Sequence, residues 1–159
     1  DIGSTSAEFG DVFIADDKAI KFGNDQDATI EYDENGDDQL KIGGAVTAFT
    51  NAVIGKTDTD TSNSGSVTLD FDANQNFVLT LTGAVTLANP STEKVGQSGF
   101  IVFIQDGTGS RAVTLGTDYE SASGSGITLT TTASATDLVP YVVVASNRVL
   151  LGTPQLAFS

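Results

Sequence analysis

Apolar and polar residues alternate with a period of two along much of this chain, and this pattern constrains its fold more than any other feature. Phe77, Leu79 and Leu81 take every second position of one segment, and residues 67–72 show the same alternation. Successive side chains of a β-strand point to opposite faces, so each segment has one face for a core and one for solvent or a second layer. No window keeps a helical period, so the sequence predicts an all-β protein.

Two later segments are continuously apolar and rich in β-branched residues, residues 99–105 and 138–145. Such runs are typical of central strands that are buried on both faces of a sheet. Together with the alternating segments they give about eight strands after residue 65. We therefore expect a β-sandwich or jelly-roll-like domain over residues 66–159.

The first 55 residues contain only short apolar pieces, each bounded by Gly, Asn or Asp. They predict short strands of a meander at residues 12–14, 20–22, 29–32 and 40–42. Asn35 and Gly36 form the strongest short-range hairpin signal, because both tolerate a positive φ. Strands this short, with so few large side chains, cannot bury a core alone, so we expect partner chains to complete it.

Residues 56–65 are polar and lack large apolar side chains, which predicts a linker or, alternatively, a long hairpin loop. The acidic residues are also unevenly placed, since residues 1–65 hold 14 of the 21. We therefore divide the chain into a β-meander docking or stalk unit (1–55), a linker (56–65) and a C-terminal knob (66–159).

The composition excludes several classes of function. The chain has no Cys and no His, which removes disulfides, zinc sites and His-based catalytic triads. Its net charge of −14 repels nucleic acid, and no apolar stretch reaches the roughly 20 residues that a membrane-spanning helix needs. We expect no nucleic-acid partner and no membrane insertion. Asp1 is not an ordinary start, so we expect a fragment or a processed chain.

Three acidic clusters contain the oxygen ligands that calcium prefers, at residues 25–27, 33–38 and 58–60. Asp25 and Asp27 form the first, and Asp33, Glu34, Asn35, Asp37 and Asp38 belong to the second. None has the Glu that closes a 12-residue EF-hand loop. Acidic turns also keep edge strands apart, so we predict neither a metal site nor a cofactor.

A glycosidase needs two carboxylates, and the pairs Asp70/Asp72 and Asp118/Glu120 would each share one face of an extended strand, so their spacing does not exclude this chemistry. Sugar sites are usually floored by aromatic rings, and the chain has no Trp and only three Tyr, namely Tyr32, Tyr119 and Tyr141. We therefore predict no catalytic residues.

Two further motifs have structural interpretations. Residues 107–109 lack the remaining glycine of a dinucleotide motif, and they predict a hairpin turn between residues 100–105 and 112–115. Arg111 and Arg148 are the only arginines, and we expect each to pair with a carboxylate of the same or a neighbouring subunit.

Three stretches resemble the C-terminal region of virion structural and tail-fibre-like proteins of marine tailed bacteriophages, residues 76–90, 96–107 and 151–159. Residues 13–24 resemble the short β repeat that often precedes that region. The resemblance covers most of the chain, and its motifs specify no active site. It implies a virion appendage, placed either on the tail as a fibre or on the head as capsid decoration.

These observations favour a non-enzymatic, homotrimeric β-rich protein on the surface of a tailed-phage virion. Its expected partners are further copies of itself and other virion proteins, because three-fold closure would complete the core of residues 1–55. The alternative is a carbohydrate-binding adhesin domain on a phage or bacterial surface, which would bind host glycan through loops at one end, with Tyr119 as a test residue. An enzyme with a carboxylate dyad is the third hypothesis.

Overall fold

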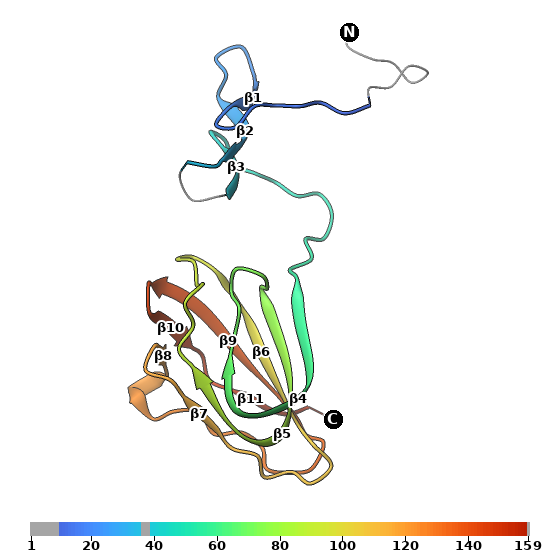
Figure 1. Cartoon of the computed structure of the whole chain (residues 1–159), viewed down its shortest axis with the longest axis vertical. Coiled ribbons are helices and arrows are strands. Elements are labelled where there is room, and N and C mark those ends of the chain that lie inside the picture. Colours follow the sequence, from blue (N-terminus) through green and yellow to red (C-terminus); the bar gives the residue numbers. More distant parts are fainter. Residues whose placement is uncertain (1–9, 36–38, 159) are drawn as a thin grey trace. The chain divides into compact units, whose positions relative to one another are not determined.

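The chain divides into two compact units, residues 1–53 and 54–159. The computed structural model describes residues 10–35 and 39–158, which consist mainly of strands, turns and loops (Figure 1). In these residues a single-turn 3₁₀ helix, η1 (Ala122–Gly124), is the one helical element, and no helix is long and apolar enough to cross a membrane. The predicted all-β class is confirmed.

The N-terminal unit holds an antiparallel sheet in the order β1 (Ala19–Phe22), β2 (Ala28–Asp33) and β3 (Gln39–Gly43). These strands match the predicted segments 20–22, 29–32 and 40–42. Residues 12–14, also expected to be extended, belong to no strand in the described part of this unit. β2 and β3 form an antiparallel pair in which Asp33 lies opposite Gln39 at the end nearest the connecting turn. This pairing agrees with a hairpin at Asn35. Residues 36–38 of the turn lie outside the described residues.

The C-terminal unit forms one large curled sheet, whose strands are linked in the order β4-β5-β6-β9-β10-β8 (Figure 1). β7 pairs with β5, and β11 pairs with β9. The strands are β4 (Thr57–Thr68), β5 (Asn76–Ala88), β6 (Ser98–Gln105), β7 (Val113–Leu115), β8 (Tyr119–Glu120), β9 (Thr136–Ala145), β10 (Arg148–Leu151) and β11 (Gln155–Phe158).

The segment predicted to be a linker, residues 56–65, lies mostly within β4, so that prediction is wrong. β4 runs parallel to β5, and this pairing gives partners to the backbone groups on the side of β4 that faces β5, while most of its polar side chains face solvent. Asn63 is the exception, since it is buried and its amide donates to the carbonyl oxygen of Thr80 at 3.1 Å. A polar composition therefore does not prevent a strand where a neighbour supplies the hydrogen bonds.

β5 is the strand around which the sheet curls, because it changes neighbours along its length. Residues 77–81 pair with β6, and residues 85–87 pair with β7. Gly83 lies between these halves, where a Cβ atom would come within 2.8 Å of the Ser64 Cβ atom. The absence of a side chain there lets β4 follow β5 closely through the bend.

The connection from β6 to β7 differs from the predicted hairpin. Both strands pair in parallel with β5, so residues 106–112 cross between two positions along the same edge. Gly109 has a φ of +75° in this connection, and its amide donates to the Asp106 carboxylate. The glycines thus mark a turn, as expected, but the turn does not join antiparallel partners.

The core of this unit lies on the concave side of the curled sheet. It is built from inward side chains of β5, β6, β9 and β10 and contains an aromatic cluster of Phe71, Phe77 and Tyr141, with ring centroids 5.1 to 6.4 Å apart. Tyr141 also donates its hydroxyl hydrogen to the carbonyl oxygen of Gln75 at 2.6 Å. This hydrogen bond fixes the turn before β5 to the centre of β9.

The prediction that β6 and β9 are buried on both faces is wrong. Ile101 and Val143 are buried, whereas Phe100, Val142 and Val144 are 37 to 38% exposed. Successive side chains alternate between the core and the convex side of the sheet. The apolar character of both strands therefore reflects a convex face that is itself apolar.

Candidate functional site

The three-stranded sheet of the N-terminal unit has one apolar face. Ile20 lies opposite Ile30, and Ile30 lies opposite Ile42, so the three isoleucines form a row across β1, β2 and β3. Directly opposed residues share a face, and so do residues two apart along a strand. The neighbouring rows add Phe22 with Ala28 and Tyr32 with Leu40.

The opposite face of this sheet is polar and charged. Glu31 lies between Ala19 and Lys41 across the sheet, and Lys21 and Asp33 occupy the adjacent rows. Lys41 forms an ion pair with Asp33. The contrast defines an amphipathic sheet, which requires an apolar partner on one side only.

That apolar face is not covered by a core within the described part of its unit. No described residue before residue 54 is buried, and Ile20, Phe22 and Ile42 are 44 to 49% exposed. A cavity of about 190 Å³ lies along this face; Ile14, Ile20, Ile30, Tyr32 and Leu40 belong to its lining, and the charged residues Asp16, Lys18 and Glu31 also border it. The described residues of this unit therefore leave a large apolar surface in contact with solvent.

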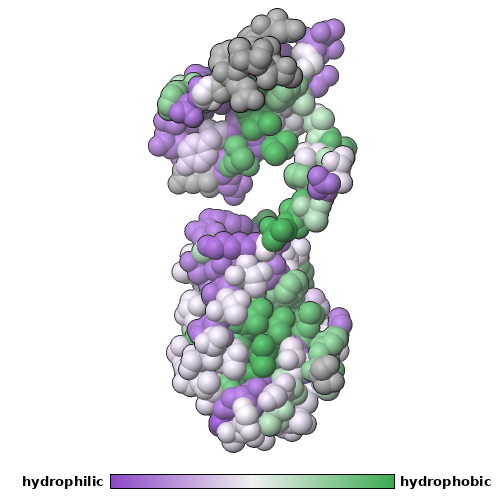
Figure 2. All heavy atoms as spheres, turned by 90° about the vertical axis from the view of Figure 1, so that its right-hand side faces the viewer, coloured by the Kyte–Doolittle hydropathy of each residue, from purple (hydrophilic) through white to green (hydrophobic). Residues whose placement is uncertain are grey.

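The convex side of the C-terminal unit carries a second apolar face, built on β5, β6 and β9. Val78 lies opposite Val102, which lies opposite Leu138, and the next row contains Thr80, Ile104 and Thr136. The face continues in two further rows, in which Phe100 lies opposite Pro140 and Ser98 lies opposite Val142, and then along β9 to Val144. Figure 2 shows a strip of hydrophobic atoms along the side of this unit that it views.

This convex face contains no ionisable side chain on its three central strands, although 18% of the chain is charged. At its margin Glu120, on β8, accepts two hydrogen bonds from Arg148, on β10, at 2.6 and 2.9 Å. The guanidinium holds the pKa of the Glu120 carboxyl below its usual range. The two charges of this pair thus neutralise each other.

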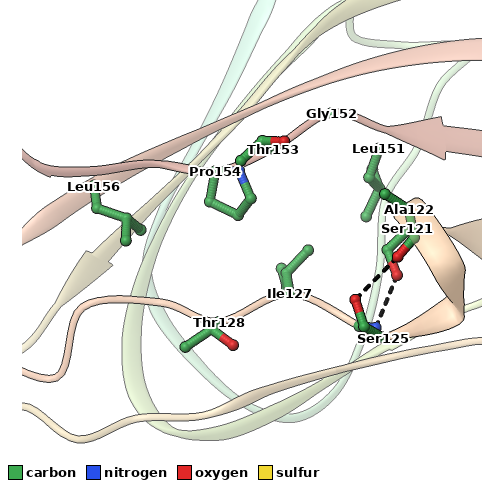
Figure 3. A pocket seen from close by; sticks show the side chains of 11 residues that line it. Ser121, Ala122, Ser125, Ile127, Thr128, Leu151, Gly152, Thr153, Pro154 and Leu156 are labelled. Carbon is green, nitrogen blue, oxygen red and sulfur yellow. Dashed lines mark hydrogen bonds between the residues drawn. The ribbon is translucent and has the colours of Figure 1, made fainter.

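An open pocket of about 310 Å³ lies between residues 121–128 and residues 151–156 (Figure 3). Ile127, Leu151 and Leu156 supply its apolar lining, and the lining includes no charged and no aromatic side chain. The Ser125 hydroxyl donates to the carbonyl oxygen of Ala122 at 3.0 Å, and the Ser121 hydroxyl accepts from the amide of Gly126 at 2.8 Å. These bonds order the loop that forms one wall.

The two carboxylate pairs considered from the sequence do not form dyads on strand faces. Asp70 and Asp72 follow the end of β4, where Asp70 accepts from the amide of Asp72 at 3.1 Å and Asp72 pairs with Lys94 at 3.2 Å. Glu120 is paired with Arg148, as described above, so a lowered pKa makes it unsuited to donate a proton near neutral pH.

The two arginines pair with carboxylates of the same chain, as predicted. Arg111 contacts Asp106 at 2.8 Å, and its guanidinium, with amide hydrogen bonds from Gly109 and Thr108, lowers the pKa of Asp106 to about 2. Arg148 binds Glu120 in the same forked manner. Both arginines therefore act within the fold of the C-terminal unit.

The acidic clusters of the calcium hypothesis are only partly described. Asp33 pairs with Lys41, while the amide groups of Glu34 and Asn35 donate to Asp17. Asp37 and Asp38 lie outside the described residues. In the described ranges no three acidic side chains are grouped so that they could hold a metal ion. The absence of a metal site remains a prediction.

Aromatic side chains that bind sugars must be exposed, but two of the three tyrosines are buried. Tyr119 and Tyr141 are each 4% exposed and belong to the core, and only Tyr32 is well exposed. Burial raises the pKa of Tyr141 to about 12, and burial together with the charge of Glu93 raises that of Tyr119 still further. Tyr119 is therefore unsuitable as a residue for testing glycan binding.

Sequence reasoning found the strands of both apolar faces but missed the faces themselves. The alternation of Ile20 with Phe22 and of Leu40 with Ile42 was a usable signal for the first face. The second was hidden, because a continuous apolar run does not distinguish a strand covered on both sides from one with a bare apolar side.

Comparison with known protein families identifies a matching family. A family model described as "Putative phage tail fibre C-terminal domain" matches residues 62–144, just over half of the 159 residues. The match spans β5, β6, β7 and β8 and most of β9, and so the strands of the convex face. No curated protein and no solved structure was found to match the chain.

Proposed function

The chain belongs to the phage tail fibre C-terminal domain family, and we propose that it is a non-enzymatic, homotrimeric appendage on the surface of a tailed-phage virion. The family makes it a structural protein of a bacteriophage. The trimeric state, the lack of catalysis and the position on the virion surface are the parts that we propose.

One observation carries the proposal of a trimer: the uncovered apolar face of β1, β2 and β3. A three-stranded sheet this small needs a second apolar layer to be stable, and the described part of its unit provides none. Three copies related by a three-fold axis would turn their isoleucine rows toward one another and form a closed core. The charged face with Lys21 and Glu31 would then remain in water.

The two units suggest a division of roles. The N-terminal unit would form a short stalk or docking segment, and the C-terminal unit, which has its own core, would form an exposed knob. Other virion proteins are the expected partners of the stalk. A tail position is favoured over head decoration by the matching family.

The absence of catalysis is supported by the way the candidate carboxylates are used. Asp70 caps the turn before β5, and Glu120 is engaged by Arg148. Neither is free to serve as one member of an acid and base pair.

The trimer can be tested by light scattering on the full chain. We expect a mass three times that of one chain, and we expect Ile42→Asp to lower it, because the substitution places a charge on the apolar face. Gln39→Asp adds the same charge to the opposite face of β3 and should leave the mass unchanged. A monomeric wild-type chain at micromolar concentration would contradict the proposal.

Glycan binding is a second candidate function, and the pocket of Figure 3 favours it. Its hydroxyl groups, including those of Thr128 and Thr153, suit sugar hydroxyls, and its aliphatic side chains suit the apolar faces of a sugar ring. A glycan array should then show binding that Thr128→Trp blocks and Thr86→Trp, at an exposed site outside the pocket, does not. Equal binding by both variants would exclude this pocket.

A further inference from the structure

We propose that the convex face of β5, β6 and β9 is a contact between copies of this chain, so that the knobs as well as the stalks associate. The proposal rests on the proposed homotrimer and assigns to it a second, separate interface. In this arrangement the three convex faces meet around the three-fold axis, and the loops at the ends of the curled sheet remain exposed.

The composition of the face is the first argument. Val78, Val102, Leu138 and Val142 belong to a continuous array of β-branched and aliphatic side chains that extends over three adjacent strands. Strands with such side chains on both faces are normally covered on both faces. The described part of the chain has only a three-residue helix, so the cover that suits the face is another sheet packed against it.

The distribution of charge is the second argument, and it favours another copy of this chain as the partner that covers the face. The chain carries −14, so identical copies repel one another over most of their surface. The convex face lacks this repulsion, because its central strands have no ionisable group and the Glu120–Arg148 pair at its margin is neutral. A second copy can therefore approach this face without like charges coming together.

Tethering supplies the third argument. Association through β1, β2 and β3 would bring the knobs of three chains together at a high effective concentration. Under that condition an apolar contact too weak to form between free domains becomes populated. The residues most exposed on the face, Phe100, Val142 and Val144, are the ones that would lose the most contact with water.

The chain has no Cys, so a single introduced thiol reports on one position. We would compare Val142→Cys, on the convex face, with Leu156→Cys, an exposed apolar position that lines the pocket between residues 121–128 and 151–156. Each full-length variant would be treated with a maleimide reagent, and its mass would be measured by light scattering in the same sample.

We expect both variants to be trimeric and the thiol at position 142 to react at least about tenfold more slowly than that at position 156, since an interface worth about 1.4 kcal/mol suffices for that ratio. Urea at a concentration that dissociates and unfolds the protein should make the two rates equal. Circular dichroism would verify that both variants fold as the wild type does.

Each other outcome overturns the inference in a recognisable way. A trimer in which both thiols react equally would remove the knob contact and leave the proposed trimer intact. A monomer with a reactive thiol at position 142 would remove both proposals. A monomer in which that thiol is protected would mean that the face is covered within one chain, and would also remove both.

Discussion

At the scale of single residues, Asp137 links three parts of the C-terminal unit. This β9 residue is 2% exposed, and its carboxylate accepts hydrogen bonds from the amide and hydroxyl groups of Thr130 at 2.6 and 2.8 Å and from the amide of Ala157 at 2.8 Å. It thereby holds the loop before β9 and the strand β11. Sequence analysis did not single it out, because one Asp in an apolar run gives no indication of its partners.

We predict that Asp137→Ala lowers the free energy of unfolding by about 3 kcal/mol, because it removes a buried carboxylate that accepts three hydrogen bonds. Urea unfolding at fixed protein concentration measures this. Asp72→Ala is the matched control, since Asp72 is exposed and its pair with Lys94 lies at the surface. The control should stay within about 0.5 kcal/mol of wild type. Equal effects of the two substitutions would contradict the role given to Asp137.

The Asp106–Arg111 pair gives a prediction about pH. The pKa of Asp106 is about 2 in the folded chain, below its ordinary value of 3.8, first because of the Arg111 hydrogen bonds and then because of the Gly109 amide. A carboxyl whose pKa is lowered by folding stabilises the fold above the ordinary value. That contribution is lost as the pH falls through about 2.

An NMR titration of the side-chain carboxyl carbon would measure this pKa. We expect Arg111→Gln to raise it toward 3.8 without reaching that value, since the amide hydrogen bonds from Gly109 and Thr108 remain. An unchanged pKa in this variant would show that the backbone amides alone account for the shift.

At the scale of strands, the sequence predicted the segments better than their neighbours. β1, β2, β3, β6 and β9 all fall where alternation or an apolar run placed them. β4 was missed because its side chains are polar, and only its parallel partner β5 makes it a strand. The pairing of β7 with β5 was missed for a similar reason: a short loop suggests a hairpin, and sequence does not show which edge the next strand joins.

The candidate surfaces show the same limit. The sequence shows which residues are apolar, but it does not show which of them face outward. That depends on the register between strands, for example the pairing of Val102 with Leu138. The stalk face could be predicted in outline from its alternation. The convex face could not, because both sides of β6 and β9 are apolar in the sequence.

The division of β6 into a core side and a convex side predicts how substitutions on it behave. Ile101 is fully buried, so Ile101→Ala should leave a cavity and lower the free energy of unfolding by about 2 to 4 kcal/mol. Val95→Ala, at a 68% exposed position just before β6, should cost less than about 0.5 kcal/mol. Denaturant melts at one protein concentration compare them, because assembly stabilises by mass action. A loss for Ile101→Ala as small as that of the control would refute this core assignment.

At the scale of the whole molecule, charge and apolar surface act in opposite directions. A net charge of −14 on 159 residues opposes association, whereas the two uncharged faces, one on each unit, favour it. The balance depends on ionic strength, because salt screens the repulsion between copies and leaves the burial of apolar surface almost unaffected.

We therefore predict that salt strengthens the assembly. Between 0.01 M and 0.15 M NaCl the screening length falls from about 30 Å to about 8 Å, so repulsion between neighbouring copies should decrease and the dissociation constant should fall. Sedimentation equilibrium at both salt concentrations measures it. Calcium chloride at matched ionic strength should act mainly as screening salt does, and Asp25→Asn or Asp33→Asn should not change its effect. Association that weakens as salt rises would mean that ion pairs, and not the uncharged faces, hold the copies together, since attraction between opposite charges is what screening removes.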